Sequence, residues 1–346
     1  MESRHFFENS IVYFQTKKKA SDMNPEKFKA ERTDAQTERS QGVSHIKGLL
    51  IESANCMSEA MERNMRTTGL TTGFYRLDEL TSGLQPGNLI VIAARTSTGK
   101  TSFALNIAQH VSILRKTGVL IFSLEMRMME IADRLQCGLA HVDSNRYKTG
   151  KLDEIELQRI IKAAASLSEA PIFIDDTGDI TLSKIRSISK ELVSNGEVGL
   201  VIVDSIQQLH TEAESRYEEL SKITRELKTL AMQLDVPVLA VSHLRQPQLS
   251  LGESKEQKTI EDLRSPSLDD LSESGGIEQI ADVVLLLFRP EAEGISDPEV
   301  KGIATVNVAK NRNGRTGQFE LNFSSENQMF ENLDEDMYAL GVLAPR

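Results

Sequence analysis

The chain of 346 residues has no tryptophan, only two cysteines and few aromatic residues (5%). Cys56 and Cys137 form neither a CxxC pair nor a metal-ligand pattern, which argues against a disulfide-stapled fold and a structural zinc site. We interpret both as free thiols in a reducing cytoplasm. No apolar run approaches the roughly 18 residues of a membrane-spanning helix, and no cleavable signal sequence is evident. These absences predict a cytoplasmic protein with no membrane partner.

Acidic residues outnumber basic ones, 51 to 40, and the formal net charge is −11. This balance argues against a protein that coats nucleic acid through a generally basic surface. A local basic path remains compatible with it, because the field at a surface depends on where charges lie rather than on their sum. The hydrophobic fraction of 39% is enough for a sizeable core, in one large domain or in two smaller ones.

The first 68 residues differ in pattern from the rest, and we predict that they form a flexible arm followed by a linker helix. Residues 15–42 are polar and poor in large apolar side chains, which is typical of a flexible segment. Apolar residues then recur at helical spacing between 43 and 66, which predicts an amphipathic helix with the stripe Ile46, Leu50, Met57, Met61 and Met65. This stripe could pack within its own subunit or dock on a neighbour, and the sequence does not decide between the two.

From residue 69 onward, short runs rich in Val, Ile and Leu alternate with longer helical patterns. The short runs predict strands at 89–93, 119–123, 171–175, 199–203, 236–241 and 282–288. The longer patterns predict helices at 100–116, 126–140, 153–168, 181–194 and 215–234. This alternation is typical of an α/β fold with a mostly parallel sheet and helices on both faces.

The C-terminal part is expected to add antiparallel strands. Two strand-like runs at 302–309 and 317–323 are joined by a segment containing Asn313-Gly314, which suits a tight reversal. Residues 245–267 carry many charges, Gly and Pro, and are expected to form a long loop. The resulting boundaries are 1–68 for the arm and linker helix, 69–331 for the α/β domain, and 332–346 for a frayed acidic tail.

A phosphate-binding loop is predicted where the first strand meets the first helix. N–H groups at a helix N-terminus point at a bound anion, and the helix dipole favours negative charge there. Gly99 would let the backbone approach a phosphate, Lys100 would reach the terminal phosphates, and the Thr101 hydroxyl would hold Mg²⁺. The predicted nucleotide-binding residues are Ala94, Arg95, Thr96, Ser97, Thr98, Gly99, Lys100, Thr101 and Ser102.

This motif departs from the usual Gly-x-x-x-x-Gly-Lys-Ser/Thr pattern, because its first position is Ala94. The alternative interpretation is a polar turn with a surface lysine. The order of strand, loop, Gly-Lys-Thr and helix favours a nucleoside triphosphate site, and the motif alone does not say what the energy is used for.

Two carboxylates follow neighbouring strands of the predicted sheet. Asp204 follows the strand at 199–203, and an acid in this position completes the magnesium site of loop NTPases. Glu125 follows the strand at 119–123, where a carboxylate can orient or deprotonate the attacking water. The alternatives are a strand-capping aspartate and a glutamate that merely suits a helix dipole. The preceding phosphate loop favours the metal role for Asp204 and the catalytic role for Glu125.

Three basic side chains have a less specific signal. His243 ends the strand at 236–241, where a polar side chain could sense the terminal phosphate, although a lone histidine is more often structural. Lys310 and Arg312 lie two residues apart in a predicted strand and therefore project to the same face. They could reach a neighbour's phosphate as an arginine finger. A solvated basic hairpin is the alternative.

Several strings between residues 69 and 331, taken jointly, are specific to one known family. They are Thr72-Gly73-Phe74, Thr81-Ser82-Gly83-Leu84-Gln85-Pro86-Gly87, Gly99-Lys100-Thr101, Phe103-Ala104-Leu105-Asn106-Ile107-Ala108, Ser123-Leu124-Glu125-Met126, Ser272-Glu273-Ser274-Gly275, Ala281-Asp282-Val283-Val284 and Lys310-Asn311-Arg312-Asn313-Gly314. In these strings the chain resembles the RecA-like motor domain of DnaB-type replicative DNA helicases. Ala94 in place of the first loop glycine is ordinary in that family.

The resemblance implies a ring-shaped homo-hexamer with ATP sites between subunits. It implies that Lys100 and Thr101 bind phosphate and Mg²⁺, that Asp204 completes the metal site, and that Glu125 is the catalytic carboxylate. His243 takes the sensor position, and Lys310 and Arg312 serve the ATP of the neighbour. The loop Glu273, Ser274 and Gly275 would bind single-stranded DNA in the central channel.

The chain also departs from the family pattern. Ser272 stands where an arginine is usual, which would remove one cationic phosphate contact, and Arg264 is a candidate to replace it. The first 68 residues are too short for the N-terminal collar domain that binds primase. Primase is therefore not an expected partner, whereas a helicase loader is a candidate.

These inferences predict an ATP-dependent hexameric DNA helicase that translocates on single-stranded DNA during replication. Two other functions stay open at this point. One is a RecA- or RadA-like ATPase of recombination or repair, although the zinc finger of RadA-type proteins is absent from the sequence. The other is a DnaB-like regulator that binds a ring without turning over ATP.

Overall fold

The computed structural model of the protein describes residues 45–62, 67–245, 265–271, 276–295 and 297–333. The chain divides into two compact units, residues 1–65 and residues 66–346. Within the first unit, helix α3 (Ile46–Glu62) confirms the helix predicted between 43 and 66. Apolar side chains Ile46, Leu50 and Met57 on α3 are more than half exposed.

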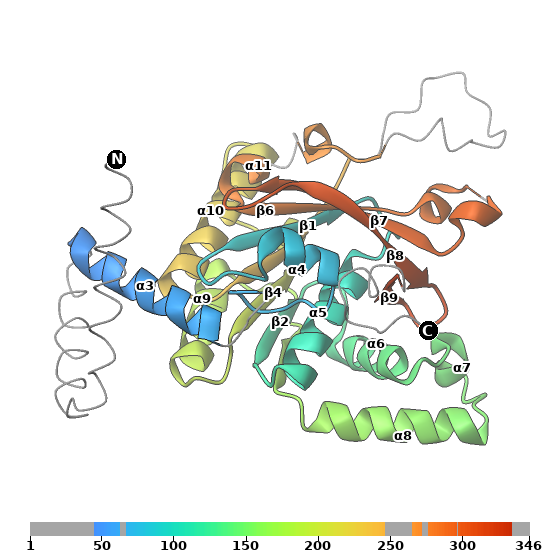
Figure 1. Ribbon diagram of the computed structural model, residues 1–346. Helices are drawn as coiled ribbons and strands as arrows, with labels where there is room; N and C mark the ends of the chain where they lie inside the picture. Colours follow the sequence, from blue (N-terminus) through green and yellow to red (C-terminus); the bar gives the residue numbers. More distant parts are fainter. Residues whose placement is uncertain (1–44, 63–66, 246–264, 272–275, 296, 334–346) are drawn as a thin grey trace, which may run out of the picture. The chain divides into compact units, whose positions relative to one another are not determined.

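The second unit is built on one nine-stranded sheet (Figure 1), with strand order β3-β2-β4-β5-β1-β6-β7-β8-β9. Pairing is parallel from β3 to β6 and antiparallel from β6 to β9. The strands are β1 (Leu89–Ala94), β2 (Val119–Ser123), β3 (Ile172–Asp175), β4 (Leu200–Asp204), β5 (Val238–His243), β6 (Val283–Phe288), β7 (Ile303–Asn311), β8 (Gly317–Ser324) and β9 (Met329–Asn332). The predicted α/β class, with a mostly parallel sheet and C-terminal antiparallel strands, is confirmed.

The described helices of this unit include those that the alternating pattern predicted between the parallel strands. They are α4 (Tyr75–Thr81), α5 (Lys100–Leu114), α6 (Met128–Ala140), α7 (Ser144–Lys148), α8 (Glu154–Ser168), α9 (Leu182–Ser194), α10 (Arg216–Leu234) and α11 (Ile277–Ile280). Short 3₁₀ turns lie at η3 (Ile206–Gln208), η5 (Leu268–Leu271), η6 (Pro290–Glu293) and η7 (Pro298–Val300). None of the helices in these described ranges is both long and apolar enough to span a membrane.

The central strands β1, β2, β4, β5 and β6 are buried on both faces of the sheet, and alternate residues of each strand face opposite layers. In β1, Ile90, Ile92 and Ala94 pack in one core cluster, while Leu89, Val91 and Ala93 pack in another. The first cluster includes residues of α4, α5 and α6, and the second includes residues of α9, α10 and α11. Full burial of such side chains stabilises the fold by about 1.5–3 kcal/mol each, which explains why the central strands read as continuous apolar runs.

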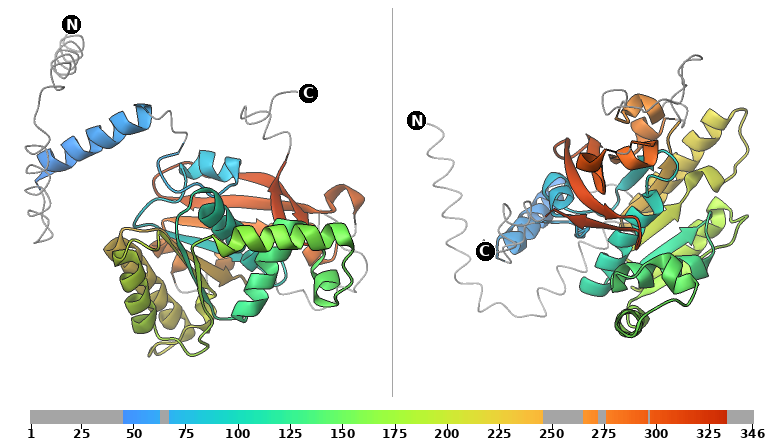
Figure 2. Two further views of the ribbon diagram at one scale, coloured as in Figure 1. Left: turned by 90° about the horizontal axis from the view of Figure 1, so that it is seen from below. Right: turned by 90° about the vertical axis from the view of Figure 1, so that its right-hand side faces the viewer.

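Local signals fix where the longer helices begin and end. The Asp153 carboxylate accepts the N–H of Glu156, and the Glu156 side chain accepts the N–H of Asp153, so a capping box opens α8. Helix α10 ends at Asp235, which has a left-handed φ of 54° and lies just before a Val-Pro pair. Helix α8 packs on α6 through a small separate cluster that includes Ile160, Ala163 and the buried free thiol Cys137, and it lies at the periphery of the unit (Figure 2).

The structure refines several predicted boundaries. Strand β5 extends to His243 and β4 extends to Asp204, so both polar side chains belong to strand ends rather than to loops. Strand β9 was not predicted, and its last residue, Asn332, lies at the start of the predicted tail. Helices α4, α7 and α11 were also not predicted. The arm within residues 1–44 and the tail from 334 lie outside the described residues.

Candidate functional site

The predicted phosphate loop joins the buried end of β1 to the first turn of α5. Ser97 and Gly99 have φ values of 63° and 105°, so the loop turns through left-handed backbone before the helix starts at Lys100. A Cβ at position 99 would lie 3.0 Å from the ring of Phe330, so the ring would have to shift by a few tenths of an ångström to admit it. The left-handed backbone requires glycine here, and the close packing also favours it.

Lys100 is folded back over this loop. It is a buried lysine, and its Nζ donates to the carbonyl oxygens of Ala94 at 3.1 Å and Arg95 at 2.9 Å. Burial lowers the pKa of Lys100, and the nearby negative charges of Asp204 and Glu125 oppose that shift. A buried ammonium beside a helix N-terminus gives the loop a concentrated positive charge suited to an anion.

Asp204 lies at the carboxyl end of β4, beside β2, where it pairs in register with Ser123. Its carboxylate is buried and accepts a hydrogen bond from the Thr101 hydroxyl, whereas its Oδ1 has no hydrogen-bond partner in the described part of the chain. Burial raises the pKa of Asp204, and the Thr101 bond opposes the rise. A buried carboxylate oxygen with no partner, next to a hydroxyl, is the donor set that Mg²⁺ shares with phosphates.

Within the described residues, no group of three or more His, Cys, Asp or Glu side chains could hold a metal ion. A cation held entirely by protein ligands is therefore not indicated there. Asp204 and Thr101 fit a magnesium ion that keeps most of its ligands as water and nucleotide oxygens.

Glu125, which follows β2, is held by side chains from two other segments. Its Oε1 lies 2.7 Å from Nε2 of His243 on β5 and accepts a hydrogen bond from Ser205, and its carboxylate is also bonded to Gln208. These bonds, the one from His243 first, lower the pKa of Glu125 to about 2 against the opposing effect of burial. The carboxylate is ionised, and about 29% of its side chain is exposed. It can therefore accept a hydrogen bond from water and orient it.

The sequence interpretation missed Ser205, Gln208 and Arg134 at this site. Ser205 donates to Glu125, and its only sequence signal is that it follows Asp204. Arg134 on α6 is close enough to Asp204 for that charge to raise the pKa of its guanidinium, against the larger lowering by burial. An arginine within a predicted helix carries no pattern that marks it, so only the packing of α6 against the sheet identifies it.

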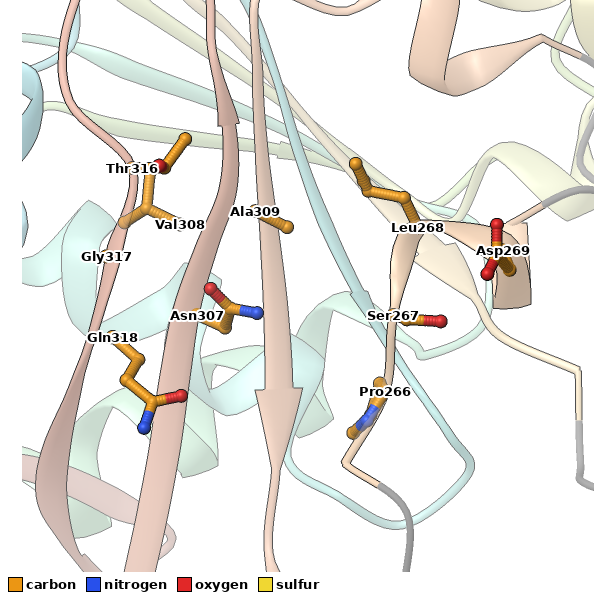
Figure 3. Close-up of a pocket in the computed structure, with 10 residues that line it drawn as sticks. All are labelled: Pro266, Ser267, Leu268, Asp269, Asn307, Val308, Ala309, Thr316, Gly317 and Gln318. Atoms are coloured by element: carbon orange, nitrogen blue, oxygen red, sulfur yellow. The ribbon is translucent and has the colours of Figure 1, made fainter.

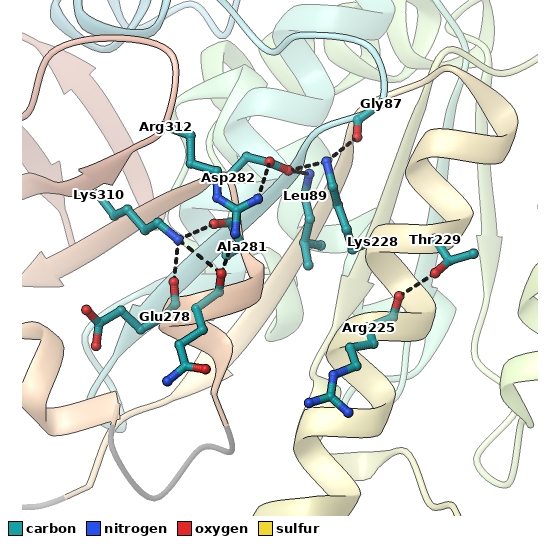
Figure 4. A network of polar contacts seen from close by, with 11 residues as sticks. Gly87, Leu89, Arg225, Lys228, Thr229, Glu278, Ala281, Asp282, Lys310 and Arg312 are labelled. Atoms are coloured by element: carbon teal, nitrogen blue, oxygen red, sulfur yellow. Dashed lines mark hydrogen bonds and ion pairs between the residues drawn. The ribbon is translucent and has the colours of Figure 1, made fainter. Parts of the chain in front are cut away.

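The predicted finger residues lie elsewhere in the unit (Figure 4). Lys310 donates to the carbonyl oxygens of Glu278 and Ala281, the latter at 2.7 Å, and Arg312 donates to the carbonyl oxygen of Gln279. Both side chains thus face the end of α11. Among the described residues, neither contacts Lys100, Glu125 or Asp204 of its own chain.

The carboxylate of Asp282 links Arg312 to the start of β1. Arg312 Nη1 lies 3.6 Å from its Oδ1, while its Oδ2 accepts from Lys228 Nζ at 2.7 Å and from the N–H of Leu89 at 2.8 Å (Figure 4). Burial of this carboxylate with two cations and a backbone donor satisfies its charge. The network holds β1, α10 and the turn after β7 together.

The remaining predicted contacts lie elsewhere or outside the structure. The predicted DNA-binding residues Glu273, Ser274 and Gly275, with Ser272 and Arg264, lie outside the described residues.

A cavity of about 540 Å³ opens between β7, β8 and the segment 266–269 (Figure 3), with Asn307 and Gln318 among its lining residues. None of the predicted nucleotide-binding residues lines this cavity.

Comparison with known proteins agrees with the sequence resemblance. The model of the DnaB-like helicase C terminal domain matches residues 69–332. The replicative DNA helicase DnaB of Geobacillus stearothermophilus is 38% identical over 87% of this chain and 64% of that protein. The replicative DNA helicase DnaC of Bacillus subtilis is 37% identical over 89% of this chain and 66% of that protein. The chain therefore spans about two thirds of the length of these relatives.

Solved structures give the same assignment. One of them, an isolated ATPase domain, superposes with a TM-score of 0.75 and 31% identity, covering 84% of this chain and all of that chain. A DnaB-like replicative helicase, whose structure was described with its interactions with primase, gives a TM-score of 0.71 and 28% identity, with 94% of this chain and 76% of that chain covered. By its sequence from 69 to 332 and by its fold, this chain belongs to the family of DnaB-like helicase C-terminal domains.

Proposed function

We propose that this chain is the ATP-hydrolysing motor of a replicative DNA helicase, a ring-shaped homo-hexamer that translocates on single-stranded DNA. The observation that carries the proposal is the meeting of Lys100, Thr101, Asp204 and Glu125 at one edge of the sheet. Together they supply three functions that phosphoryl transfer to water needs: a charge on the phosphates from Lys100, a metal position at Thr101 and Asp204, and the ionised carboxylate of Glu125. The relatives' names as replicative helicases support the assignment to unwinding.

The residues of the site divide the chemistry as follows. Lys100 would exchange its two backbone carbonyl acceptors for the terminal phosphates of ATP. Thr101 and Asp204 would hold Mg²⁺, which when bound neutralises charge on the phosphate oxygens. Glu125 would orient the attacking water and accept its proton, and Ser205 and His243 keep this carboxylate ionised and fixed in direction.

In our proposal, one protomer supplies only part of each ATP site. Lys310 and Arg312 face α11 of their own chain and not its phosphate loop. We therefore propose that they act on the ATP of the adjacent subunit, where an arginine finger contributes roughly 10³–10⁵ in rate. The proposed partners are single-stranded DNA, contacted by Glu273, Ser274 and Gly275, and further copies of this chain.

The test is substitution of Lys100 by alanine in the full chain. Removing one preorganised charge at the reacting phosphate is expected to lower kcat for ATP by at least about 10²–10³ and to abolish unwinding. ATPase activity and strand separation are measured on a forked DNA with a single-stranded 5′ tail. The exposed Lys162→Ala on α8 serves as the matched control and should retain both activities.

If the Lys100→Ala protein still unwinds the fork, the proposed function is wrong. A wild-type ATPase that ignores the 5′ tail and separates no strands would instead indicate a recombination or repair ATPase. Absence of ATP turnover by the wild type with DNA present would indicate a regulator.

A further inference from the structure

The segment that follows β6 lies against the phosphate loop. Strand β6 pairs in parallel with β1, so its carboxyl end lies beside the point where the loop begins. We call residues 289–293 the strap; it consists of Arg289 and the 3₁₀ turn η6 (Pro290–Glu293). Arg289 is 8% exposed, although it is a charged residue beside a proposed binding loop. Because charged side chains are rarely buried to this extent, the contacts of the Arg289 guanidinium indicate its role.

The strap contacts the loop at two positions. Glu293 Oε1 lies 3.2 Å from Nη1 of Arg95, at the start of the loop. Arg289 Nη1 donates to the carbonyl oxygen of Thr98 at 3.4 Å, just before Gly99. At 3.4 Å the bond is long, so its effect comes from a full positive charge that faces a carbonyl dipole in buried surroundings.

Two further contacts fix the plane of the Arg289 guanidinium. Its central carbon lies 3.7 Å from the centroid of the Phe323 ring, and its Nη2 lies 3.6 Å from Oε2 of Glu291. Phe323 in turn packs on Phe330, with ring centroids 4.6 Å apart, and Phe330 is the side chain that lies under Gly99. Arg289 is therefore held by a layer that also supports the loop, and it has little freedom to turn away.

Anchoring the Thr98 carbonyl determines where the next N–H points. In a planar trans peptide, the C=O of one residue and the N–H of the following residue point in opposite directions. Because the Thr98 oxygen is directed at Arg289, the N–H of Gly99 is directed away from Arg289 and the layer that holds it. Backbone N–H groups of such a loop cradle the α- and β-phosphates.

We infer that Arg289 is a positioning residue that orients the peptide between Thr98 and Gly99 and so sets the preference of the site for nucleotides with a β-phosphate. The inference rests on the proposed function, because it assumes that the loop binds a nucleotide. Arg289 touches the loop backbone and acts on the ligand only through it.

The experiment compares ADP and AMP affinities of the full chain, each measured by competition against a fluorescent ADP analogue. Arg289→Met keeps most of the side-chain volume and removes the charge. Arg289→Met is expected to weaken ADP binding by roughly tenfold or more, because the N–H of Gly99 would no longer be oriented toward the phosphate. That is the loss typical of a hydrogen bond to a charged group. AMP affinity should change much less. Arg289→Lys keeps the charge without the planar fork and should give an intermediate ADP-to-AMP ratio.

Arg186→Met is the matched control, because Arg186 pairs with Glu226 between α9 and α10 and contacts no residue of the loop. It should keep the wild-type ratio. The melting temperature of each nucleotide-free protein is recorded as well, so that loss of folding is separated from loss of orientation.

An Arg289→Met protein with the wild-type ADP-to-AMP ratio overturns the inference, as does an equal loss of affinity for both nucleotides. If Arg289→Met does not fold, Arg289→Lys decides by the same criterion. Wild-type protein that binds ADP no better than the Lys100→Ala variant contradicts the proposed function itself. ADP binding by the wild type together with an unchanged Arg289 variant rejects only the positioning role.

Discussion

At the residue scale, the site depends on one carboxylate whose ionisation is fixed by its neighbours. The pKa of Glu125 is lowered to about 2, and the hydrogen bond from His243 is the largest cause. Because the folded pKa lies below the ordinary value of 4.5, Glu125 stabilises the fold fully above about pH 4.5. That contribution is lost as the pH falls toward 2.

This linkage predicts the pH dependence of His243→Ala. Removal of the imidazole should raise the pKa of Glu125 toward its ordinary value, so the acid limb of the ATPase profile should move to higher pH. The measurement is kcat between pH 4 and 8 for both proteins, over the range in which each stays folded. In this range Glu125 should cause no loss of kcat in the wild type, because its pKa of about 2 lies below it, whereas the variant should lose activity toward pH 4. His141→Ala, at the exposed end of α6, is the control. A variant that keeps the wild-type profile down to pH 4 would contradict the assigned cause.

Asp78 shows the opposite linkage, away from the chemistry. Burial raises its pKa to about 6 from the usual 3.8, although the backbone N–H and hydroxyl of Thr72 donate to it. A raised folded pKa means that the folded state binds more protons between these values, so stability falls as the pH rises from about 4 to 6.

We expect this loss to approach about 3 kcal/mol in the free energy of unfolding, from two pH units at 1.4 kcal/mol each. Asp78→Asn should remove that slope, because the amide does not titrate. Urea unfolding at several pH values measures it, with the exposed neighbour Glu79→Gln as control. A slope in Asp78→Asn as steep as in the wild type would disprove the assignment.

At the scale of elements, the antiparallel C-terminal strands support the phosphate loop. Phe330 of β9 packs against Phe103 of α5, with ring centroids 5.3 Å apart, and lies under Gly99. The N–H of Phe330 also donates to Asn106 Oδ1 at 2.8 Å. Strand β9 therefore holds the helix that follows the loop.

Phe330→Ala is expected to lower the free energy of unfolding by about 3–5 kcal/mol, the cost of deleting a buried phenyl ring and leaving a cavity. Denaturant unfolding of the full chain measures this loss. Tyr217→Ala, which truncates an exposed aromatic side chain on α10, is the control. A change below about 1 kcal/mol would show that β9 is peripheral to the core.

The elements also show how far the sequence could be interpreted. Continuous apolar runs such as Val119 to Ser123 are long enough to mark buried parallel strands, and each of the six predicted parallel strands is present. Helix α7 and strand β9 were not predicted, because each spans only about one turn or a few residues. Such a segment is too short to show a helical or strand period in its apolar residues. Their stability comes from packing against distant elements.

The candidate site was predictable for a related reason. Gly99-Lys100-Thr101 is contiguous in the chain, and Asp204 and Glu125 follow apolar strands whose carboxyl ends must meet at one edge. Arg134, Ser205 and Arg289 could not be found in this way. Their roles arise from the packing of α6, η3 and the strap against that edge, which no local pattern encodes.

At the scale of the whole molecule, we propose that two copies of the chain complete each ATP site. Lys310 and Arg312 are held by carbonyl groups at the end of α11 and by Asp282. A head-to-tail ring brings one face of each protomer against a different face of the next, so such residues can serve a neighbour while remaining far from their own loop.

Mixing two inactive variants tests this claim most directly. Lys100→Ala lacks a working loop, Arg312→Ala lacks the finger, and each alone should have little ATPase activity. In mixed rings, some interfaces combine the intact loop of an Arg312→Ala protomer with the intact finger of a Lys100→Ala neighbour. With equal amounts of both variants, roughly a quarter of the interfaces have this combination. ATPase activity should therefore rise well above the sum of the activities of the separate variants. Activity that stays at that sum in rings shown to be mixed, or an Arg312→Ala protein as active as the wild type, would contradict a site shared between protomers.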